Sequence, residues 1–299
     1  MKQTAIVYNP TSGRGRGAGI FETVGAMLSA RGVPFRAYPS ASDRMPAACT
    51  EQALADGAEL VLVLGGDGTI HEAARPLVGT DAVLGIVPCG SGNDLSRSLG
   101  IPKDPGKAVE IALNGTVRRM DAGLANGELF FNVAGCGFDV DVLVNEKTLH
   151  SVSRNGSVPY YLALLKSLLH LNIRQTTAAW KGGSVTSSAL IIAAGNGGFF
   201  GGGMNIAPGA DPFDGMLDFC IIKDVHWYDV LFLLPRFLKG THIRSDKVLY
   251  FRGEELTVTM DPASELELDG EIGGKTPVTF RVLPGALNIM VAAQPHTEG

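Results

Sequence analysis

The chain has 299 residues, of which 39 are glycine, about 13% against an average near 7%. With 45% hydrophobic and 18% charged residues it is too apolar for a disordered linker, and its glycines lack the period of collagen. The net charge of -5 gives no overall basic field, so we expect no nucleic-acid partner.

The length predicts about two domains with substantial apolar cores. The four cysteines are widely spaced without a CxxC pair, and the first residues lack the apolar run of a signal peptide, so we expect a cytoplasmic protein. Two apolar windows, residues 158–171 and 230–238, are too short and too interrupted to span a bilayer. Membrane contact would therefore be peripheral, and whether the chain forms a homodimer is left open.

The first 120 residues alternate strand-like and helical runs. Residues 4–8, 35–38, 60–64 and 83–87 predict strands, and residues 20–30, 47–55 and 70–77 predict helices. This order is typical of a Rossmann-like, three-layer α/β domain with a mostly parallel sheet. Ligand-binding loops are expected where its strands end.

After residue 121 the alternation of strand-like and helical runs gives way to mostly short strand-like runs. Short runs at 129–133, 189–194, 217–222, 255–260, 265–268 and 278–282 predict strands of an antiparallel sandwich or barrel, interrupted by helices at 159–171 and 227–238. A last strand at 286–292 could pair with either half. We therefore expect two domains, residues 1–124 and 125–299, with an active site in the cleft between them.

The sharpest motif is GGDGTIHE at residues 65–72, which follows a continuous apolar strand. Glycines there would let the main chain approach a ligand, and the amides of a turn at a helix N-terminus bind phosphate. The alternative is an ordinary strand-to-helix turn capped by Asp67 or Thr69. Neither a P-loop nor a clean GxGxxG fingerprint is present.

Two further polar, glycine-rich loops follow predicted strands. NPTSGRGRG at residues 9–17 could wrap a triphosphate or be a solvated loop, and PCGSGNDL at 88–95 again opens a helix. Three such loops at one sheet edge favour a nucleotide site.

Two acidic turns occur in the second half. Asp211, Asp214 and Met216 lie in a turn where carboxylate and carbonyl oxygens could bind Mg²⁺, or where the acids are simply solvated. In ELDGE at residues 267–271, a carboxylate could accept the proton of an attacking hydroxyl, although an isolated Asp-Gly turn usually has no such role.

Taken together, the chain resembles the diacylglycerol kinase catalytic-domain family, specifically the soluble bacterial lipid kinases. The resemblance covers almost the whole chain and rests on an ordered series of motifs: NPTSG at 9–13, GGDGTIHE at 65–72, GSGNDLSRSLGIP at 90–102, RRMDAG at 118–123, FNVAGCGFD at 131–139, GNGGFFGGGMNIAPGADPFDGMLD at 195–218 and ELDGE at 267–271. Ser91 stands where many relatives have Thr, and His71 where many have Asn. Both replacements keep a hydrogen-bonding group.

The resemblance implies an ATP site for the first domain. Its residues would be Asn9, Pro10, Thr11, Ser12, Gly13, Ser40, Gly65, Gly66, Asp67, Gly68, Thr69, Ile70, His71, Glu72, Ser91, Asn93 and Asp94. Ser42 is an alternative to Ser40, and either serine could instead be a turn or cap residue. Asp67 and Asp94 are expected to position the water shell of the Mg²⁺ that accompanies ATP.

The resemblance also assigns roles in the second domain. Asp211, Asp214 and Met216 would bind a second, structural Mg²⁺, the first and third through carbonyl oxygens. It places the catalytic base in the DGE unit, where Glu271 is the first candidate and Asp269 the second.

The expected activity is transfer of the γ-phosphate of ATP to the primary hydroxyl of a lipid, in the simplest case diacylglycerol to give phosphatidate. Alternatives are a kinase for a sphingoid base, ceramide or phosphatidylglycerol, a metabolite kinase related to NAD kinases, and a non-catalytic sensor. The windows at 158–171 and 230–238 could border an acyl-chain groove, with Lys166, Arg236 and Lys239 facing an anionic membrane, or could be core helices.

Overall fold

The structure of the chain, a computed structural model, describes residues 3–137 and 173–293. The chain forms two compact units, Met1–Asp121 with Pro284–Gly299, and Ala122–Leu283. The predicted helix at 159–171 and Lys166 lie outside the described residues.

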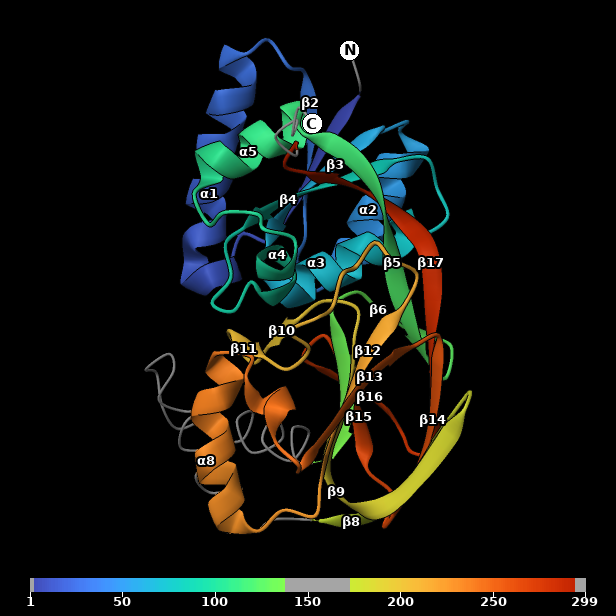
Figure 1. Ribbon diagram of the computed structural model, residues 1–299. Helices are drawn as coiled ribbons and strands as arrows, with labels where there is room; N and C mark the ends of the chain where they lie inside the picture. Colours follow the sequence, from blue (N-terminus) through green and yellow to red (C-terminus); the bar gives the residue numbers. More distant parts are fainter. Residues whose placement is uncertain (1–2, 138–172, 294–299) are drawn as a thin grey trace, which may run out of the picture. The chain divides into compact units, whose positions relative to one another are not determined.

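The first unit is a three-layer α/β structure, as predicted (Figure 1). Its elements are β1 (Thr4–Tyr8), α1 (Ser12–Ala30), β2 (Phe35–Pro39), α2 (Pro46–Ala55), β3 (Leu60–Gly65), α3 (Asp67–Ala74), η1 (Arg75–Leu77), β4 (Val83–Pro88), α4 (Asp94–Ser98), α5 (Pro105–Asn114) and the start of β5 (Thr116–Ala125). The strands run in the order β2-β1-β3-β4 and all these pairs are parallel. Helices α1 and α5 pack together, as do α2 and α3.

The sheet forms because its central strands are apolar along their whole length. Every residue of β3 and β4 is buried, the pattern of a parallel sheet covered on both faces. The last segment of the chain joins this sheet, since Asn288 and Ile289 pair in parallel with Val83 and Leu84 of β4. The open choice for the last strand is thus resolved in favour of the first unit.

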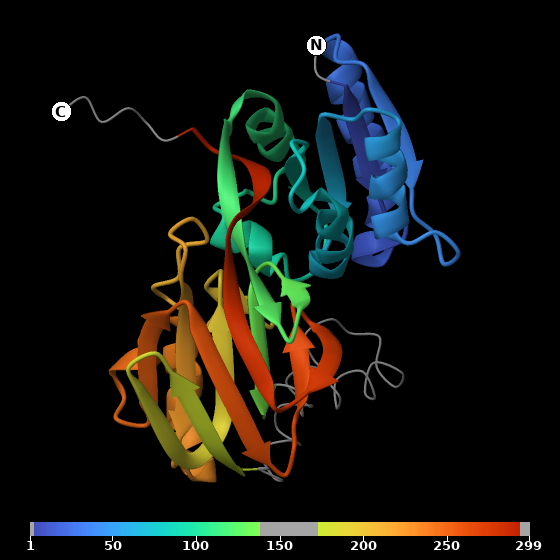
Figure 2. The ribbon, with the colours of Figure 1, turned by 90° about the vertical axis from the view of Figure 1, so that its right-hand side faces the viewer.

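The second unit is a mainly antiparallel β structure (Figure 2). Its elements are β6 (Glu128–Phe130), β7 (Val133–Gly137), β8 (Arg174–Trp180), β9 (Gly183–Gly195), β10 (Phe199–Phe200), β11 (Met204–Asn205), β12 (Leu217–Lys223), α8 (Trp227–Leu238), η2 (His242–Arg244), β13 (Val248–Gly253), β14 (Glu255–Asp261), β15 (Glu265–Leu268), β16 (Glu271–Lys275) and most of β17 (Val278–Val291).

Alternation along β9 and β12 gives this unit two apolar faces. Ile192 and Phe219 belong to a core shared with β14, β15 and β17, whereas Ile191 and Cys220 belong to a second core with α8. Helix α8 has the predicted bounds and buries Val230, Leu233 and Phe237 in that second core.

Several predicted boundaries are wrong. The strand expected at 129–133 is two strands, β6 and β7, because the main-chain N–H groups of residues 131–133 donate to a carboxylate instead of to a neighbouring strand. The strands expected at 278–282 and 286–292 are one strand, β17. Helices α1 and α3 begin earlier than predicted, at Ser12 and Asp67, so the glycine-rich loops 9–17 and 65–72 contribute their first turns.

No helix within the described ranges combines the length and the apolar character needed to cross a bilayer. All four cysteines are buried free thiols.

Candidate functional site

The three glycine-rich segments of the first unit begin at one edge of its sheet. Tyr8 is level with Leu64, and Gly65 is level with Pro88, so β1, β3 and β4 end together because they are parallel. Strand β3 passes into α3 with a single residue, Gly66, between them. The first-turn N–H groups of a helix have no acceptor within the helix, and here they follow the strand end directly.

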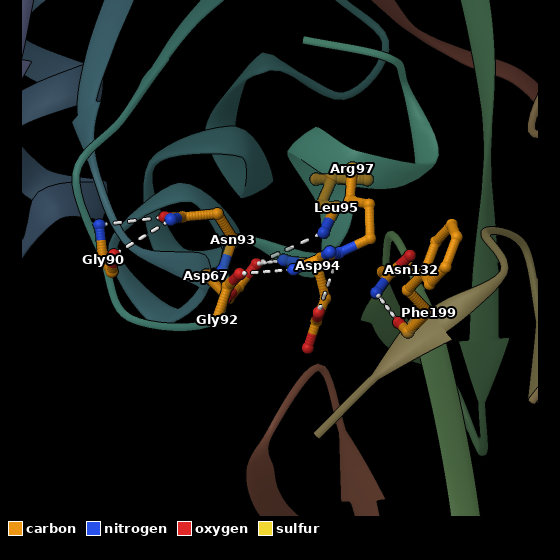
Figure 3. Close-up of polar contacts among 9 residues, drawn as sticks. All are labelled: Asp67, Gly90, Gly92, Asn93, Asp94, Leu95, Arg97, Asn132 and Phe199. Carbon is orange, nitrogen blue, oxygen red and sulfur yellow. Dashed lines mark hydrogen bonds and ion pairs between the residues drawn. The ribbon is translucent and has the colours of Figure 1, made fainter. Parts of the chain in front are cut away.

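Asp67 ties two of these segments together (Figure 3). Its Oδ1 accepts hydrogen bonds from the main-chain N–H groups of Asp94 (2.7 Å) and Leu95 (3.2 Å), and its Oδ2 accepts one from Asn93 (2.7 Å). A carboxylate has about four acceptor positions. Most of those of Asp67 are therefore used to hold the start of α4.

The loop before α4 is further fixed by Asn93, which has a left-handed φ of 57°. Its side-chain amide donates to the Gly90 carbonyl (2.9 Å) and accepts from the Gly90 N–H (2.8 Å), as Figure 3 shows. Arg97 lies beside this loop, with its Nε 3.7 Å from Oδ1 of Asp94 and its Nη2 3.4 Å from the Gly92 carbonyl oxygen.

Glycine is required where the segments touch. A Cβ on Gly90 would lie 2.5 Å from Cα of Gly66, and a Cβ on Gly13 would overlap the carbonyl oxygen of Cys89. The hydroxyl oxygens of Ser12 and Thr69 are 3.3 Å apart. The three segments thus form one packed main-chain surface.

The other predicted ATP residues differ in exposure. Oδ1 of Asn9 accepts from the N–H and the hydroxyl of Thr11, which folds the 9–11 turn around Pro10. The side chains of Thr69, Ile70 and His71 are buried.

Two predicted serines have contrasting surroundings. Ser91 is exposed on the 88–95 loop. Ser40 is buried, and its hydroxyl donates to the Tyr8 carbonyl (3.2 Å), whereas its alternative Ser42 is exposed. Glu72, the last residue of the GGDGTIHE motif, pairs with Arg75 of η1 at 3.9 Å.

In the second unit, Asp269 and Gly270 form the two-residue turn of the β15–β16 hairpin. Leu268 pairs with Glu271 across it, and both turn residues have positive φ, 52° and 92°, which is typical of a type I′ turn. Glu271 is therefore the first residue of β16, and its side chain is exposed.

The Asp269 side chain repeats the arrangement of Asp67. Its Oδ2 accepts from the N–H of Phe131 (2.7 Å), and its Oδ1 from the N–H groups of Asn132 (2.9 Å) and Val133 (3.1 Å). Its own N–H donates to the Val133 carbonyl at 2.9 Å. This carboxylate, the second candidate for the base, is thus the acceptor for three consecutive amides.

The segment held by Asp269 in turn holds another. Asn132 donates through Nδ2 to the Phe199 carbonyl (2.5 Å, Figure 3), and its carbonyl accepts from the N–H groups of Asn196 and Gly197, both at 2.8 Å. Nδ2 of Asn196 donates to the Phe131 carbonyl at 2.8 Å. The FNVAGCGFD, GNGGFF and ELDGE motifs therefore meet at one point of the second unit.

The acidic turn has its own polar network. Oδ1 of Asp211 accepts from the N–H of Phe213 (3.2 Å) and Oδ1 of Asp214 from that of Met216 (3.0 Å). Oδ2 of Asp214 pairs with the Arg252 guanidinium.

A buried carboxylate lies next to this turn. Asp218 accepts from the Tyr250 hydroxyl (2.5 Å) and lies 3.5 Å from Nε of Arg252, while the Tyr250 hydroxyl accepts from the N–H of Gly209 (3.0 Å). Burial raises the pKa of the Asp218 carboxyl, the Tyr250 hydrogen bond offsets part of the rise, and the negative charge of Asp211 adds to it.

The carboxylates of this turn are oxygen donors of the kind that Mg²⁺ prefers. Arg252 contacts both Asp214 and Asp218, and the negative charge of Asp211 adds to the rise in the pKa of Asp218. Within the described residues no group of three or more His, Cys, Asp and Glu side chains could hold a metal. A cation here would depend on main-chain carbonyls and water as well.

Four polar residues of these networks were not identified from the sequence: Asn132, Asn196, Tyr250 and Arg252. Both asparagines lie in apolar segments, where a buried amide must find hydrogen-bond partners, and that signal could have found them. Nothing local in the sequence connects Tyr250 and Arg252 of β13 with the acidic turn, since antiparallel pairing with β12 brings them there.

The sequence matches two protein families. Residues 3–125 match the Diacylglycerol kinase catalytic domain, and residues 133–291 match the YegS C-terminal NAD kinase beta sandwich-like domain.

Relatives resemble the chain over nearly its whole length. A diacylglycerol kinase from Bacillus subtilis (strain 168) is 32% identical over 294 residues, covering 94% of this chain and 93% of its own. One from Mycobacterium tuberculosis (strain CDC 1551 / Oshkosh) is 32% identical over 296 residues, covering 97% and 94%. A solved structure of a diacylglycerol kinase from Bacillus anthracis str. Sterne has a TM-score of 0.74 at 20% identity, covering 97% of each chain, and therefore shows the same fold.

Proposed function

Because this chain belongs to the diacylglycerol kinase family and is a lipid kinase, a phosphotransferase with an alcohol as acceptor, we propose that its substrates are ATP and diacylglycerol and its product phosphatidate. The observation that carries the nucleotide half of the proposal is the direct passage of β3 into α3 at Gly66, packed against Gly90. A main-chain surface with a helix N-terminus at its edge suits phosphate groups.

The phosphates of ATP would lie along the 65–69 segment, with the 9–13 and 88–95 segments beside it. Mg²⁺ bound with ATP would spread the phosphate charge. Since most acceptor positions of Asp67 are engaged by α4, Asp67 shapes this surface, and Asp94 is the candidate for contact with the hydrated metal.

For the chemical step, Glu271 is the proposed base. It would accept the proton of the lipid hydroxyl while the hydroxyl oxygen forms a bond to the γ-phosphorus and the bond from that phosphorus to the bridging oxygen breaks, releasing ADP. Its exposure on the first residue of β16 supports this choice, and the engagement of Asp269 by three amides speaks against the alternative.

Two further proposals concern the second unit. Asp211, Asp214 and Met216 would hold a structural Mg²⁺, supported by the oxygen donors of this turn and by the pairing of Asp214 with the side chain of Arg252. The exposed face of α8, with Phe232 72% exposed, would contact the membrane surface that carries the lipid.

The test is transfer of label from ATP to lipids in mixed micelles, using the intact chain. The panel contains diacylglycerol, a sphingoid base, ceramide and phosphatidylglycerol, and NAD is tested in the same buffer. We expect labelled phosphatidate as the main product. Preferential labelling of another lipid or of NAD would replace diacylglycerol as the substrate, and ATP binding without transfer to any acceptor would favour the sensor.

Glu271→Gln tests the base in the same assay. We expect kcat to fall by about 10²- to 10⁴-fold, because the glutamine cannot accept the proton. Glu265→Gln is the matched control, since Glu265 is a partly exposed carboxylate of the same hairpin, paired with Lys275 at 3.7 Å. Full turnover of Glu271→Gln would show that another group is the base.

A further inference from the structure

The Asp269 carboxylate occupies an unusual place for a proton acceptor. It lies in the turn of the hairpin that carries Glu271, and both of its oxygens accept main-chain hydrogen bonds, from Phe131, Asn132 and Val133 at 2.7 to 3.1 Å. These three residues are buried, with 0%, 5% and 2% of their surface exposed. The donor side of these hydrogen bonds is therefore shielded from water, and the Asp269 acceptor is half-buried.

The second turn residue is held as well. The N–H of Gly270 donates to Oε1 of Glu267 at 2.5 Å, and the N–H of Asp269 donates to the Val133 carbonyl at 2.9 Å. The chain therefore enters β16 from a turn whose side chain and main chain are both bound. Because Glu271 is the residue directly after this turn, the turn fixes where Glu271 lies.

We infer that Asp269 is a positioning residue, which fixes the turn before Glu271 by clamping the amides of residues 131–133, and is not the group that takes the substrate proton. The inference rests on the proposed role of Glu271. It extends that role by naming what places the base and by connecting the base to the segment that holds residues 196–199.

The clamp makes a specific demand on the side chain. Asparagine at position 269 keeps one oxygen, so it can accept from Asn132 and Val133, but its NH₂ group would face the N–H of Phe131, and two donors do not bond. The turn itself tolerates asparagine, because Asn126 and Gly127 adopt the same φ values, 52° and 92°, in the β5–β6 turn. Asp269→Asn therefore loosens the clamp without removing the turn.

The experiment compares Asp269→Asn and Glu271→Gln with the intact chain. Its readouts are hydrogen exchange of the amides of residues 131–133 and the pH dependence of kcat for lipid phosphorylation. Asp224→Asn is the matched control, because Asp224 also has a left-handed φ, 51°, and is exposed.

For Asp269→Asn we expect faster exchange at residues 131–133, most of all at Phe131. We also expect kcat to fall about 10- to 100-fold, the scale of a small misplacement of a reacting group, while the pH dependence that the base confers is kept. Glu271→Gln should lose that pH dependence with normal exchange at 131–133. Asp224→Asn should change neither readout.

Unchanged exchange at residues 131–133 in Asp269→Asn would overturn the clamp. Loss of the pH dependence in Asp269→Asn, with its retention in Glu271→Gln, would make Asp269 the base. If Asp269→Asn does not fold, Asp269→Glu serves instead: it keeps a carboxylate but displaces it, so a positioning role predicts faster exchange, and normal exchange with normal kcat overturns the inference. Failure of the intact chain to phosphorylate any lipid would contradict the proposed function and leave the exchange result as the separate test of the clamp.

Discussion

Asp67 and Asp269, each followed by glycine, bind three consecutive main-chain amides in their respective units. Hydrogen bonds to charged groups contribute about 1.5 to 3 kcal/mol each, so a single such carboxylate is a large part of local stability. In the acidic turn, by contrast, Asp214 binds one amide and the side chain of Arg252. A carboxylate held by another side chain can exchange its partner for a metal ion more readily than one embedded in the main chain.

The proposed Mg²⁺ site predicts a pair of opposite effects in titration calorimetry. Asp214→Ala should weaken Mg²⁺ binding by at least about tenfold, because it removes a carboxylate ligand. Arg252→Gln should strengthen it, since the guanidinium that competes for Asp214 and Asp218 is gone. Asp246→Ala, at an exposed acid on the same unit, is the control. Equal affinity in the intact chain and Asp214→Ala would exclude this site.

Among the elements, α8 has two apolar sides with different surroundings. Val230, Leu233 and Phe237 pack into the core with Ile222 and Val248. This side of α8 is therefore a core side, one of the two interpretations that the sequence allowed. Tyr228, Phe232 and Leu238 are 45%, 72% and 62% exposed. The exposed Arg236 and Lys239 add positive charge at the C-terminal end of α8, as an interfacial helix on an anionic membrane would require.

The membrane proposal predicts binding of the intact chain to equimolar phosphatidylcholine and phosphatidylglycerol vesicles in a flotation assay. Phe232→Ser should reduce this binding about tenfold, because the phenyl ring no longer enters the apolar layer. Met45→Ser removes a comparably exposed apolar side chain, 53% exposed, from the first unit and should have no effect. Equal binding by Phe232→Ser would show that this face of α8 does not contact the membrane.

The beginnings of helices α1 and α3 could not be predicted from apolar periodicity. Apolar periodicity located α1 and α3 but placed their beginnings eight and three residues late, because the first turns consist of glycines and polar residues. These turns are held by contacts with other segments. Gly13, for example, lies so close to Cys89 of the 88–95 segment that a Cβ would overlap its carbonyl oxygen.

At the scale of the whole molecule, β17 belongs to both units. Its first part pairs with β14, from Val278 to Arg281, and its last part pairs with β4. Between these two parts of β17, the N–H of Gly285 donates to Oδ1 of Asp121 (2.6 Å), and Arg119 donates to the Gly285 carbonyl at 2.9 and 3.1 Å. The first unit is thus built from two stretches of sequence.

A chain ending at Leu283 should therefore lose cooperative unfolding of the first unit. It lacks four buried side chains, Leu287, Ile289, Met290 and Val291. Their burial contributes roughly 6 to 12 kcal/mol, comparable with the whole stability of a typical domain. Calorimetry should show the transition of the first unit missing or strongly lowered compared with that of the full chain. Identical transitions in both would mean that the first unit is complete without β17.

The α/β and antiparallel halves, the core strands and the motif segments could be predicted from the sequence, because they depend on local periodicity and on residues close together in the chain. Two features needed the folded chain: the pairing of the last strand with the first unit, and the hydrogen bonds of Asp269 to residues more than 130 positions earlier. The physical reason is that a carboxylate is satisfied by whichever donors the fold brings within about 3 Å, and sequence spacing does not encode that distance.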